Sequence, residues 1–169
     1  AKGKVVSTVM SNLGLNRYLK SLGIGLHRTS VGDRYVVEAM RQNGYNLGGE
    51  KSGHIVMSDY AATGDGLLAA LHFLTILNES SSKASSLLTA FQAIPQKLVN
   101  LTFDPSRDPM GERDVINLIN QCEKRLGDSG EIIVRKSGTE PVIRIMIQHH
   151  DGTKVSSIIE EIRSKIQRT

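Results

Sequence analysis

The chain has 169 residues, 39% of them hydrophobic, and carries 21 basic against 17 acidic side chains, a formal net charge of +4. This length suffices for one ordinary domain or two small ones, each with its own core. No run reaches the roughly 20 apolar residues of a membrane helix, and the first residues lack the apolar stretch of a signal peptide. The composition therefore predicts a cytoplasmic, globular protein with no membrane partner.

The small positive charge suits an anionic ligand or an ordinary solvated surface. Aromatic residues make up only 4% of the chain, and no basic run is interleaved with Tyr or Phe. Because base stacking needs such side chains, we expect no nucleic-acid partner. The single cysteine, Cys122, excludes an internal disulfide. It lies in an apolar helical pattern, where a buried hydrophobic side chain is expected instead of a catalytic thiol.

The first half alternates short β-rich runs with helical patterns. We expect strands at 4–10 and 24–27, helices at 13–22 and 33–42, and a further strand at 54–58. A loop with three glycines precedes the last of these strands. This alternation predicts a mainly parallel α/β layer domain.

A leucine-rich segment follows the motif Thr63-Gly64-Asp65-Gly66. Its apolar positions are Leu67, Leu68, Leu71, Leu74 and Leu77. Their spacings of one, three, three and three suit one face of a helix, with Thr63 or Asp65 as N-cap, so we expect a core helix. A Ser-rich turn at 78–86 and a short helix at 87–94 follow, and Pro95 marks the expected domain boundary.

The pattern of elements restarts at residue 97. We expect a strand at 97–103, a polar turn at 104–109, and then a helix that ends at Gly127. The apolar positions of this helix are Val115, Ile119, Cys122 and Leu126, at intervals of four, three and four.

Two further strands, at 131–135 and 142–148, flank a loop. A final helix is expected to cover them. Its apolar positions are Val155, Ile158, Ile159, Ile162 and Ile166. The second half thus predicts a small α+β sandwich domain at 95–169, after the α/β domain at 1–94, with a separate core in each.

The segment 135–141 reads RKSGTEP, and Arg144 follows on the next strand. A phosphate dianion needs several converging donors, and this segment offers two hydroxyls, two guanidiniums and a glycine that lets a backbone N–H approach closely. These groups belong to Arg135, Ser137, Gly138, Thr139 and Arg144. The alternative is a tight turn with solvated charges, which explains the glycine and Pro141 but not the paired hydroxyls and arginines.

The segment 49–54 reads GEKSGH. Glu50 and Ser52 are two residues apart, so their side chains can point the same way and bind sugar hydroxyls. His54 adds a group that can transfer a proton near neutral pH or become a cation beside a phosphate. A polar hairpin in which His54 begins a strand is an equally good interpretation of the residues alone.

Together the two loops resemble those of the α-D-phosphohexomutase family, in which a GE-x-SGH loop of the third domain binds the sugar and an R-x-SGTEP-x-x-R loop of the fourth binds the phosphate. The resemblance covers essentially the whole chain. The segments 6–12, 31–36, 63–66 and 95–100 are most similar to the phosphoglucosamine mutase branch. Phosphomannomutase and phosphoglucomutase are the alternatives.

This resemblance implies a role for each loop residue. Glu50 and Ser52 would contact sugar hydroxyls, and His54 would assist proton transfer at the reacting end. The cradle for the phosphate that does not react would consist of Arg135, Ser137, Gly138, Thr139 and Arg144. The family often has a lysine where this chain has Ser30, so the role of that lysine is open here.

The family also requires a phosphoserine in a T-A-S-H-N-P-like motif and a magnesium loop similar to D-G-D-G-D-R. Neither motif occurs in this chain. Asp65, between two glycines, supplies too few oxygen ligands for a metal and is expected to cap a helix. We therefore expect no metal site in the chain and no turnover by the chain alone.

The resemblance implies that the chain is the substrate-binding C-terminal half of an enzyme that interconverts glucosamine 6-phosphate and glucosamine 1-phosphate through a bisphosphate. The substrate of that enzyme would be a hexosamine phosphate, and its cofactors would be Mg²⁺ and a sugar bisphosphate activator. The reacting serine and the magnesium loop would belong to the N-terminal half, which would be the partner of this chain. A stand-alone module that binds phosphosugars without catalysis is the competing hypothesis. The sequence leaves the oligomeric state open.

Overall fold

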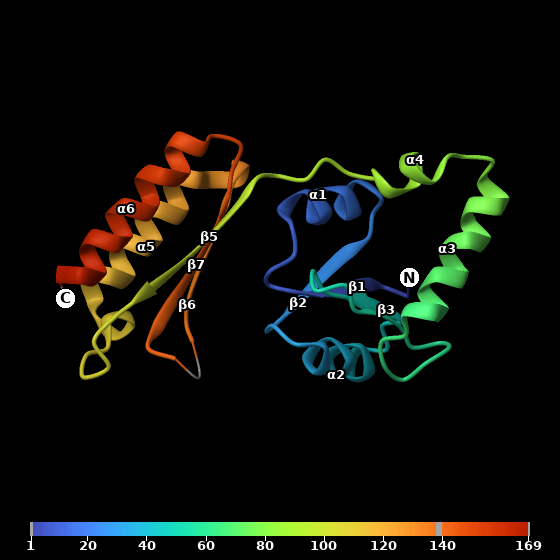
Figure 1. Ribbon diagram of the computed structural model, residues 1–169, viewed down its shortest axis with the longest axis horizontal. Coiled ribbons are helices and arrows are strands. Elements are labelled where there is room, and N and C mark those ends of the chain that lie inside the picture. Colours follow the sequence, from blue (N-terminus) through green and yellow to red (C-terminus); the bar gives the residue numbers. More distant parts are fainter. Residues whose placement is uncertain (1, 138–139, 169) are drawn as a thin grey trace. The chain divides into compact units, whose positions relative to one another are not determined.

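The computed structural model describes residues 2–137 and 140–168, and it divides into two compact units (Figure 1). The first unit ends at Ala93 and the second begins at Ile94. Each unit has its own cluster of buried apolar side chains.

The first unit is a four-stranded sheet in the order β2-β1-β3-β4. Strand β1 runs parallel to β2 and β3, whereas β4 runs antiparallel to β3, so the predicted mainly parallel α/β layer is confirmed. The strands are β1 Lys4–Thr8, β2 Gly25–Thr29, β3 Leu47–Gly49 and β4 Ile55–Met57, and the connecting helices are α1 Leu13–Ser21 and α2 Asp33–Asn43.

The core of the first unit lies between the sheet and α2. Val6, Gly48 and Val56 are register partners on neighbouring strands and face Val36 and Met40 of the helix. A Cβ atom on Gly48 would lie 2.6 Å from Met40 Sδ and 2.7 Å from Val36 Cγ1. The glycine is therefore required because α2 packs so close to the strand.

Helix α3, Gly66–Ser80, begins where the sequence predicts but is not a core helix. The side chain of Asp65 accepts a hydrogen bond from the backbone N–H of Leu68 at 2.9 Å, as an N-cap does. No residue of α3 is buried, and Leu67 is 73% exposed. The leucine spacing predicted a helix correctly, but periodicity cannot show whether another element covers the apolar side chains of that helix.

The short helix before the boundary lies earlier than predicted. Helix α4 spans Ala84–Leu88, not 87–94. The hydroxyl of Thr89 donates to the carbonyl oxygens of Ser85 and Ser86, which closes the helix at its C-terminal end. The residues from 89 to Pro95 are irregular. The proline therefore lies beyond the end of the helix and does not determine where the helix ends.

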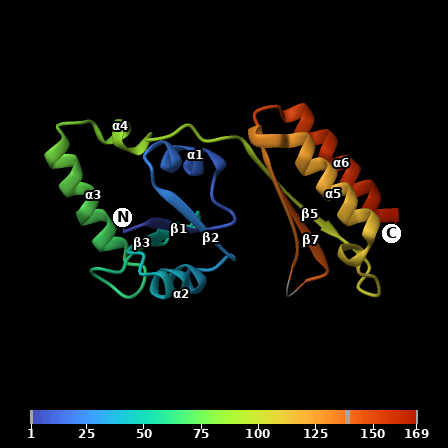
Figure 2. The same ribbon diagram turned by 180° about the vertical axis from the view of Figure 1, so that it is seen from behind.

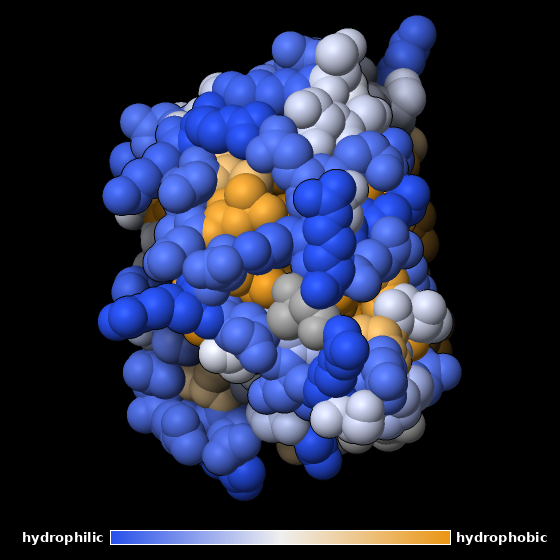
Figure 3. Space-filling view, turned by 90° about the vertical axis from the view of Figure 1, so that its left-hand side faces the viewer, coloured by the Kyte–Doolittle hydropathy of each residue, from blue (hydrophilic) through white to orange (hydrophobic). Residues whose placement is uncertain are grey.

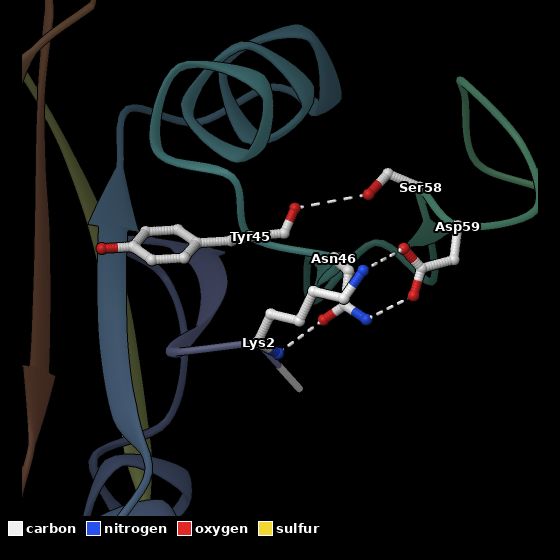
Figure 4. A network of polar contacts seen from close by, with 5 residues as sticks. All are labelled: Lys2, Tyr45, Asn46, Ser58 and Asp59. Atoms are coloured by element: carbon white, nitrogen blue, oxygen red, sulfur yellow. Dashed lines mark hydrogen bonds and ion pairs between the residues drawn. The ribbon is translucent and has the colours of Figure 1, made fainter.

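A polar network joins the start of the chain to the turn after β4 (Figure 4). The ammonium group of Lys2 lies 3.0 Å from Asp59, whose other carboxylate oxygen accepts from the Asn46 amide at 2.6 Å. The Lys2 backbone N–H donates to Asn46 Oδ1 at 2.7 Å, and the hydroxyl of Ser58 donates to the Tyr45 carbonyl at 3.3 Å. The bond from Asn46, and then the bond from Lys2, lower the pKa of the Asp59 carboxyl.

The second unit is a three-stranded antiparallel sheet in the order β5-β7-β6 with both long helices on one face (Figures 1 and 2). The strands are β5 Gln96–Thr102, β6 Glu131–Lys136 and β7 Val142–Gln148. The helices are α5 Arg113–Leu126 and α6 Gly152–Arg168, with single 3-10 turns at Pro109–Gly111 and Gly127–Ser129. This arrangement confirms the predicted α+β sandwich.

The core of the second unit joins alternate residues of all three strands to the inner faces of α5 and α6. Its buried members are Leu101, Val115, Cys122, Leu126, Ile132, Ile143, Ile145, Ile147, Val155, Ile158, Ile159, Ile162 and Ile166.

Burial raises the pKa of the Cys122 thiol, as expected of a structural cysteine. At the surface, Arg125 binds both carboxylate oxygens of Glu161, at 2.6 and 2.9 Å, and so links the two helices.

The surface of the second unit seen in Figure 3 is mostly hydrophilic, with separate apolar areas between hydrophilic side chains. The described helices include none with the length and apolar character that a membrane span requires.

Candidate functional site

Two arginines lie directly opposite each other on neighbouring strands of the second unit. Arg135 of β6 and Arg144 of β7 are register partners. Ile145 and Val134, the adjacent residues, face the helices, so both arginines project from the opposite face of the sheet. Like charges at directly opposite positions destabilise a sheet. An anion bound between the two guanidiniums would remove this repulsion, because guanidinium groups bind phosphate in a bidentate manner.

The loop that follows Arg135 is anchored at both ends by backbone bonds. The Ser137 N–H donates to the Val142 carbonyl at 2.7 Å, and the Phe103 N–H donates to the Pro141 carbonyl at 3.1 Å. Ser137 is two residues beyond Arg135 and only 8% exposed, so its hydroxyl belongs to the arginine-bearing end of the sheet. The other two predicted cradle residues, Gly138 and Thr139, lie outside the described residues.

The charged neighbours of the arginine pair are arranged unequally. Glu140 lies 3.4 Å from the guanidinium of Arg144, a long and exposed ion pair. Lys136 projects to the helix face, where its ammonium group lies 3.2 Å from Asp108 and 5.2 Å from the ring centre of Phe103. Lys136 therefore contacts the helix side of the sheet. It does not belong to the arginine face, the face of the sheet from which Arg135 and Arg144 project.

The candidate sugar loop of the first unit is a tight hairpin between β3 and β4. The Glu50 N–H donates to the His54 carbonyl, and the Gly53 N–H donates to the Glu50 carbonyl, each at 3.0 Å. Gly53 has a φ of 100°, a backbone conformation that glycine adopts without strain. The ladder of β3 and β4 thus continues to residues 50 and 54, and the loop itself is three residues long.

The three candidate side chains of this hairpin meet at one nitrogen. Ser52 Oγ lies 2.9 Å from Nδ1 of His54, and Oε1 of Glu50 lies 3.6 Å from the same nitrogen. The Glu50 side chain is 10% exposed, whereas that of His54 is 53% exposed. Because Nδ1 is held from inside the loop, Nε2 is the nitrogen that the imidazole presents to a ligand.

The structure therefore brings together Glu50, Ser52 and His54 in one unit, and Arg135, Ser137 and Arg144 in the other. Sequence reasoning identified these residues by motif but missed two relations. The cross-strand register of the arginines depends on strand pairing through a loop, and the contacts of Ser52 and Glu50 with the imidazole depend on how the hairpin turns. An alternation count along β6 and β7 would have placed both arginines away from the core.

The described residues do not fit a magnesium ion. Within 2–137 and 140–168, no three His, Cys, Asp or Glu side chains converge on one point. The carboxylate of Asp65, the candidate singled out in the sequence, already caps α3. A single carboxylate at a helix start lacks the oxygen ligands that magnesium requires.

Two family models match the chain. The α/β/α domain III of phosphoglucomutase/phosphomannomutase matches residues 1–94, and the C-terminal domain of phosphoglucomutase/phosphomannomutase matches residues 98–165. The chain belongs to this family. The resemblance identified from the two loops is thereby confirmed.

Several curated relatives of the chain are named phosphoglucosamine mutases. The protein from Paracoccus denitrificans is 50% identical over 98% of the chain, and that from Methylorubrum extorquens strain PA1 is 49% identical over 97%. These alignments cover 37% and 36% of the relatives, so the chain spans little more than a third of their length.

Solved structures of the family share the fold at low sequence identity. An Aspergillus fumigatus N-acetylphosphoglucosamine mutase superposes with a TM-score of 0.79 at 17% identity, over 97% of this chain and 39% of the other. A second structure of that enzyme, in complex with GlcNAc-6P and magnesium, gives a TM-score of 0.75 at 18% identity, over 97% and 41%. The α/β and α+β architecture is therefore that of the family.

Proposed function

We propose that this chain is the substrate-binding part of a phosphoglucosamine mutase, an isomerase that interconverts glucosamine 6-phosphate and glucosamine 1-phosphate. The observation that carries the proposal is the in-register pair Arg135 and Arg144, which faces away from the core beside an anchored loop. The 50% identity to phosphoglucosamine mutases supports a hexosamine phosphate over other hexose phosphates as the substrate.

In this proposal the arginine face holds the phosphate that does not react. Arg135 and Arg144 supply four terminal N–H₂ groups between them. Ser137 and Thr139 supply hydroxyls, and Gly138 supplies a backbone N–H that the phosphate can approach closely. Each contact is charge-assisted. Binding at this end fixes the distance and direction of the sugar relative to the reacting end, which is the entropic part of catalysis.

The hairpin of the first unit recognises the sugar. Glu50 accepts hydrogen bonds from ring hydroxyls, and Ser52 exchanges its bond to the imidazole for one to the sugar. Nε2 of His54 can give or take a proton at the oxygen that gains or loses the phosphoryl group. Glu50, whose Oε1 lies 3.6 Å from Nδ1, helps to hold the imidazole in this orientation.

The remaining parts of the reaction belong to the rest of the parent enzyme. These are the phosphoserine that exchanges a phosphoryl group with the sugar, the Mg²⁺ that neutralises the moving charge, and the bisphosphate activator. We place the enzyme in the cytoplasm, where its product supplies amino-sugar precursors of the peptidoglycan cell wall.

An NMR titration of the chain with glucosamine 6-phosphate tests the proposal. We expect a dissociation constant in the millimolar range, about 4 kcal/mol of binding free energy, with shifts centred on 135–144. Arg144→Ala should abolish the shifts. An enzyme-linked assay with magnesium and a bisphosphate activator should show no turnover. Shifts confined to other residues, or genuine turnover by the chain, would contradict the proposal.

The sugar loop is tested in the full-length enzyme. Glu50→Ala and Ser52→Ala should lower kcat/KM for every hexose phosphate and leave the fold intact, because both groups address hydroxyls and not the phosphate. Wild-type kinetics in both variants would show that this hairpin does not bind the sugar.

A further inference from the structure

A third polar side chain continues the row formed by the two arginines. Asn100 of β5 is the register partner of Arg144, on the side away from Arg135. It is exposed and lies between Val99 and Leu101, both of which contact the core, so its side chain projects from the arginine face. The row Arg135, Arg144, Asn100 therefore crosses all three strands at one level.

The side chains in this row differ in length and in the contacts that they already make. Within residues 2–137 and 140–168, no side chain pairs with Arg135 or Asn100, and Arg144 has only the 3.4 Å contact with Glu140. Directly opposite Cβ atoms lie about 5 Å apart. At that separation the short side chain of Asn100 is long enough to meet Nε of Arg144, whereas the terminal N–H₂ groups of the guanidinium extend further from the sheet.

We propose that Asn100 is a positioning residue that holds Arg144 for the phosphate. When an anion occupies the row, Arg144 leaves Glu140, and Oδ1 of Asn100 accepts the hydrogen bond from Nε–H. Both terminal N–H₂ groups then remain for the ligand. This inference rests on the proposed phosphate site and adds a residue to it.

An asparagine suits this position because its acceptor is neutral. A carboxylate opposite Arg144 would compete with the phosphate for the guanidinium and repel it, whereas an amide oxygen fixes the direction of the side chain without adding negative charge. The weak pair with Glu140 shows the contrast, since that carboxylate can hold Arg144 only by occupying the same donors that the phosphate needs.

The test is a titration of the ¹⁵N-labelled chain with inorganic phosphate at constant ionic strength. Asn100→Ala should weaken phosphate binding about tenfold, the loss of one hydrogen bond to a charged group. Asn100→Asp should weaken it further. Thr102→Ala, on the same strand and the same exposed face, is the matched control and should bind as the wild type does. Thermal unfolding of all variants should agree within experimental error.

A double-mutant cycle separates positioning from a general structural effect. Arg144→Lys has no guanidinium Nε–H, so Asn100→Ala added to it should change phosphate affinity less than about twofold. An equal loss in both backgrounds would overturn the inference, as would wild-type binding by Asn100→Ala. If the wild-type chain itself bound no phosphate, the proposed function would fall and this inference with it. If the wild type bound phosphate and Asn100→Ala bound it equally well, this inference would be wrong but the proposed function would stand.

Discussion

The two units of the chain bury their apolar side chains to different extents. Among the described residues, the core of the second unit contains thirteen buried members, whereas that of the first contains five. The first unit also has the apolar helix α3, in which no residue is buried. Since apolar burial is the main favourable term in folding, the second unit should be the more stable one, and the first should rely more on polar bonds and close packing at a few positions.

The two candidate sites also differ in how far their side chains contact one another. In the first unit the site side chains contact one another around Nδ1 of His54. In the second they are two opposed arginines with little compensation among the described residues. The unit that we expect to be more stable thus carries the site with the less compensated charges, which is common where a binding site lowers the stability of a fold.

The largest expected effect is in the second core. Ile145 is fully buried in the central strand, so Ile145→Ala should destabilise the second unit by about 3 kcal/mol, as a lost side chain and a cavity together do. Denaturant unfolding followed by resolved NMR signals from each unit would measure it. Leu98→Ala, at a 52% exposed position on the neighbouring strand, should change stability by less than about 0.5 kcal/mol. Equal losses for the two variants would contradict the assigned core.

The next effect concerns the close approach of α2 to the sheet in the first unit. Gly48→Ala should cost about 2 kcal/mol, because the added methyl group meets Met40 and Val36 well inside contact distance. Gly66→Ala is the control, since a Cβ atom there meets nothing within 4 Å. If Gly48→Ala unfolded with the wild-type midpoint, α2 would not pack against this strand as described.

Most of the second unit could be predicted from its sequence. The apolar spacing of Val115, Ile119, Cys122 and Leu126 defined α5, and the strand at 142–148 was identified with its observed bounds. These elements have one face on a shared core, so the hydrophobic period and the packing agree.

The first unit shows where such reasoning stops. The leucine spacing predicted that α3 is a helix but not that its side chains are exposed. Periodicity describes a single element, whereas burial requires a second element that packs against it. The site was similar: the motifs named Arg135 and Arg144, but their opposition across two strands, and the place of Asn100 beside them, follow from register. Register depends on pairing between distant segments, which one sequence does not display.

A smaller effect is expected from the arginine pair itself. Arg135→Met should raise the stability of the second unit by about 0.5 kcal/mol, because it removes a like-charge cross-strand pair. The same variant should weaken phosphate binding at least tenfold. Thermal unfolding and phosphate titration of one sample measure both. A variant that loses stability and binding together would indicate a structural role for this guanidinium instead.

The smallest effect is the response of the first unit to acid. Because Asn46 and Lys2 lower the folded-state pKa of Asp59, the carboxylate contributes stability above the ordinary aspartate pKa of about 3.9. That contribution is lost as pH falls below this value and through the lowered folded-state pKa. Asp59→Asn should remove this part of the pH dependence when the melting temperature of the first unit is followed from neutral to acidic pH. An unchanged acid response would show that the Lys2–Asp59 contact contributes nothing in solution.

The uncovered leucines of α3 also determine how a solution of the chain behaves. Leu67, Leu71 and Leu74 are each more than half exposed, and a stripe of this kind favours association between molecules. Excluded salts such as ammonium sulfate strengthen contacts between apolar surfaces, so the chain should precipitate at lower sulfate concentrations than a variant with Leu67→Glu and Leu71→Glu. The amount of sulfate that precipitates the chain would then change with substitutions on α3 that leave the buried cores of both units untouched.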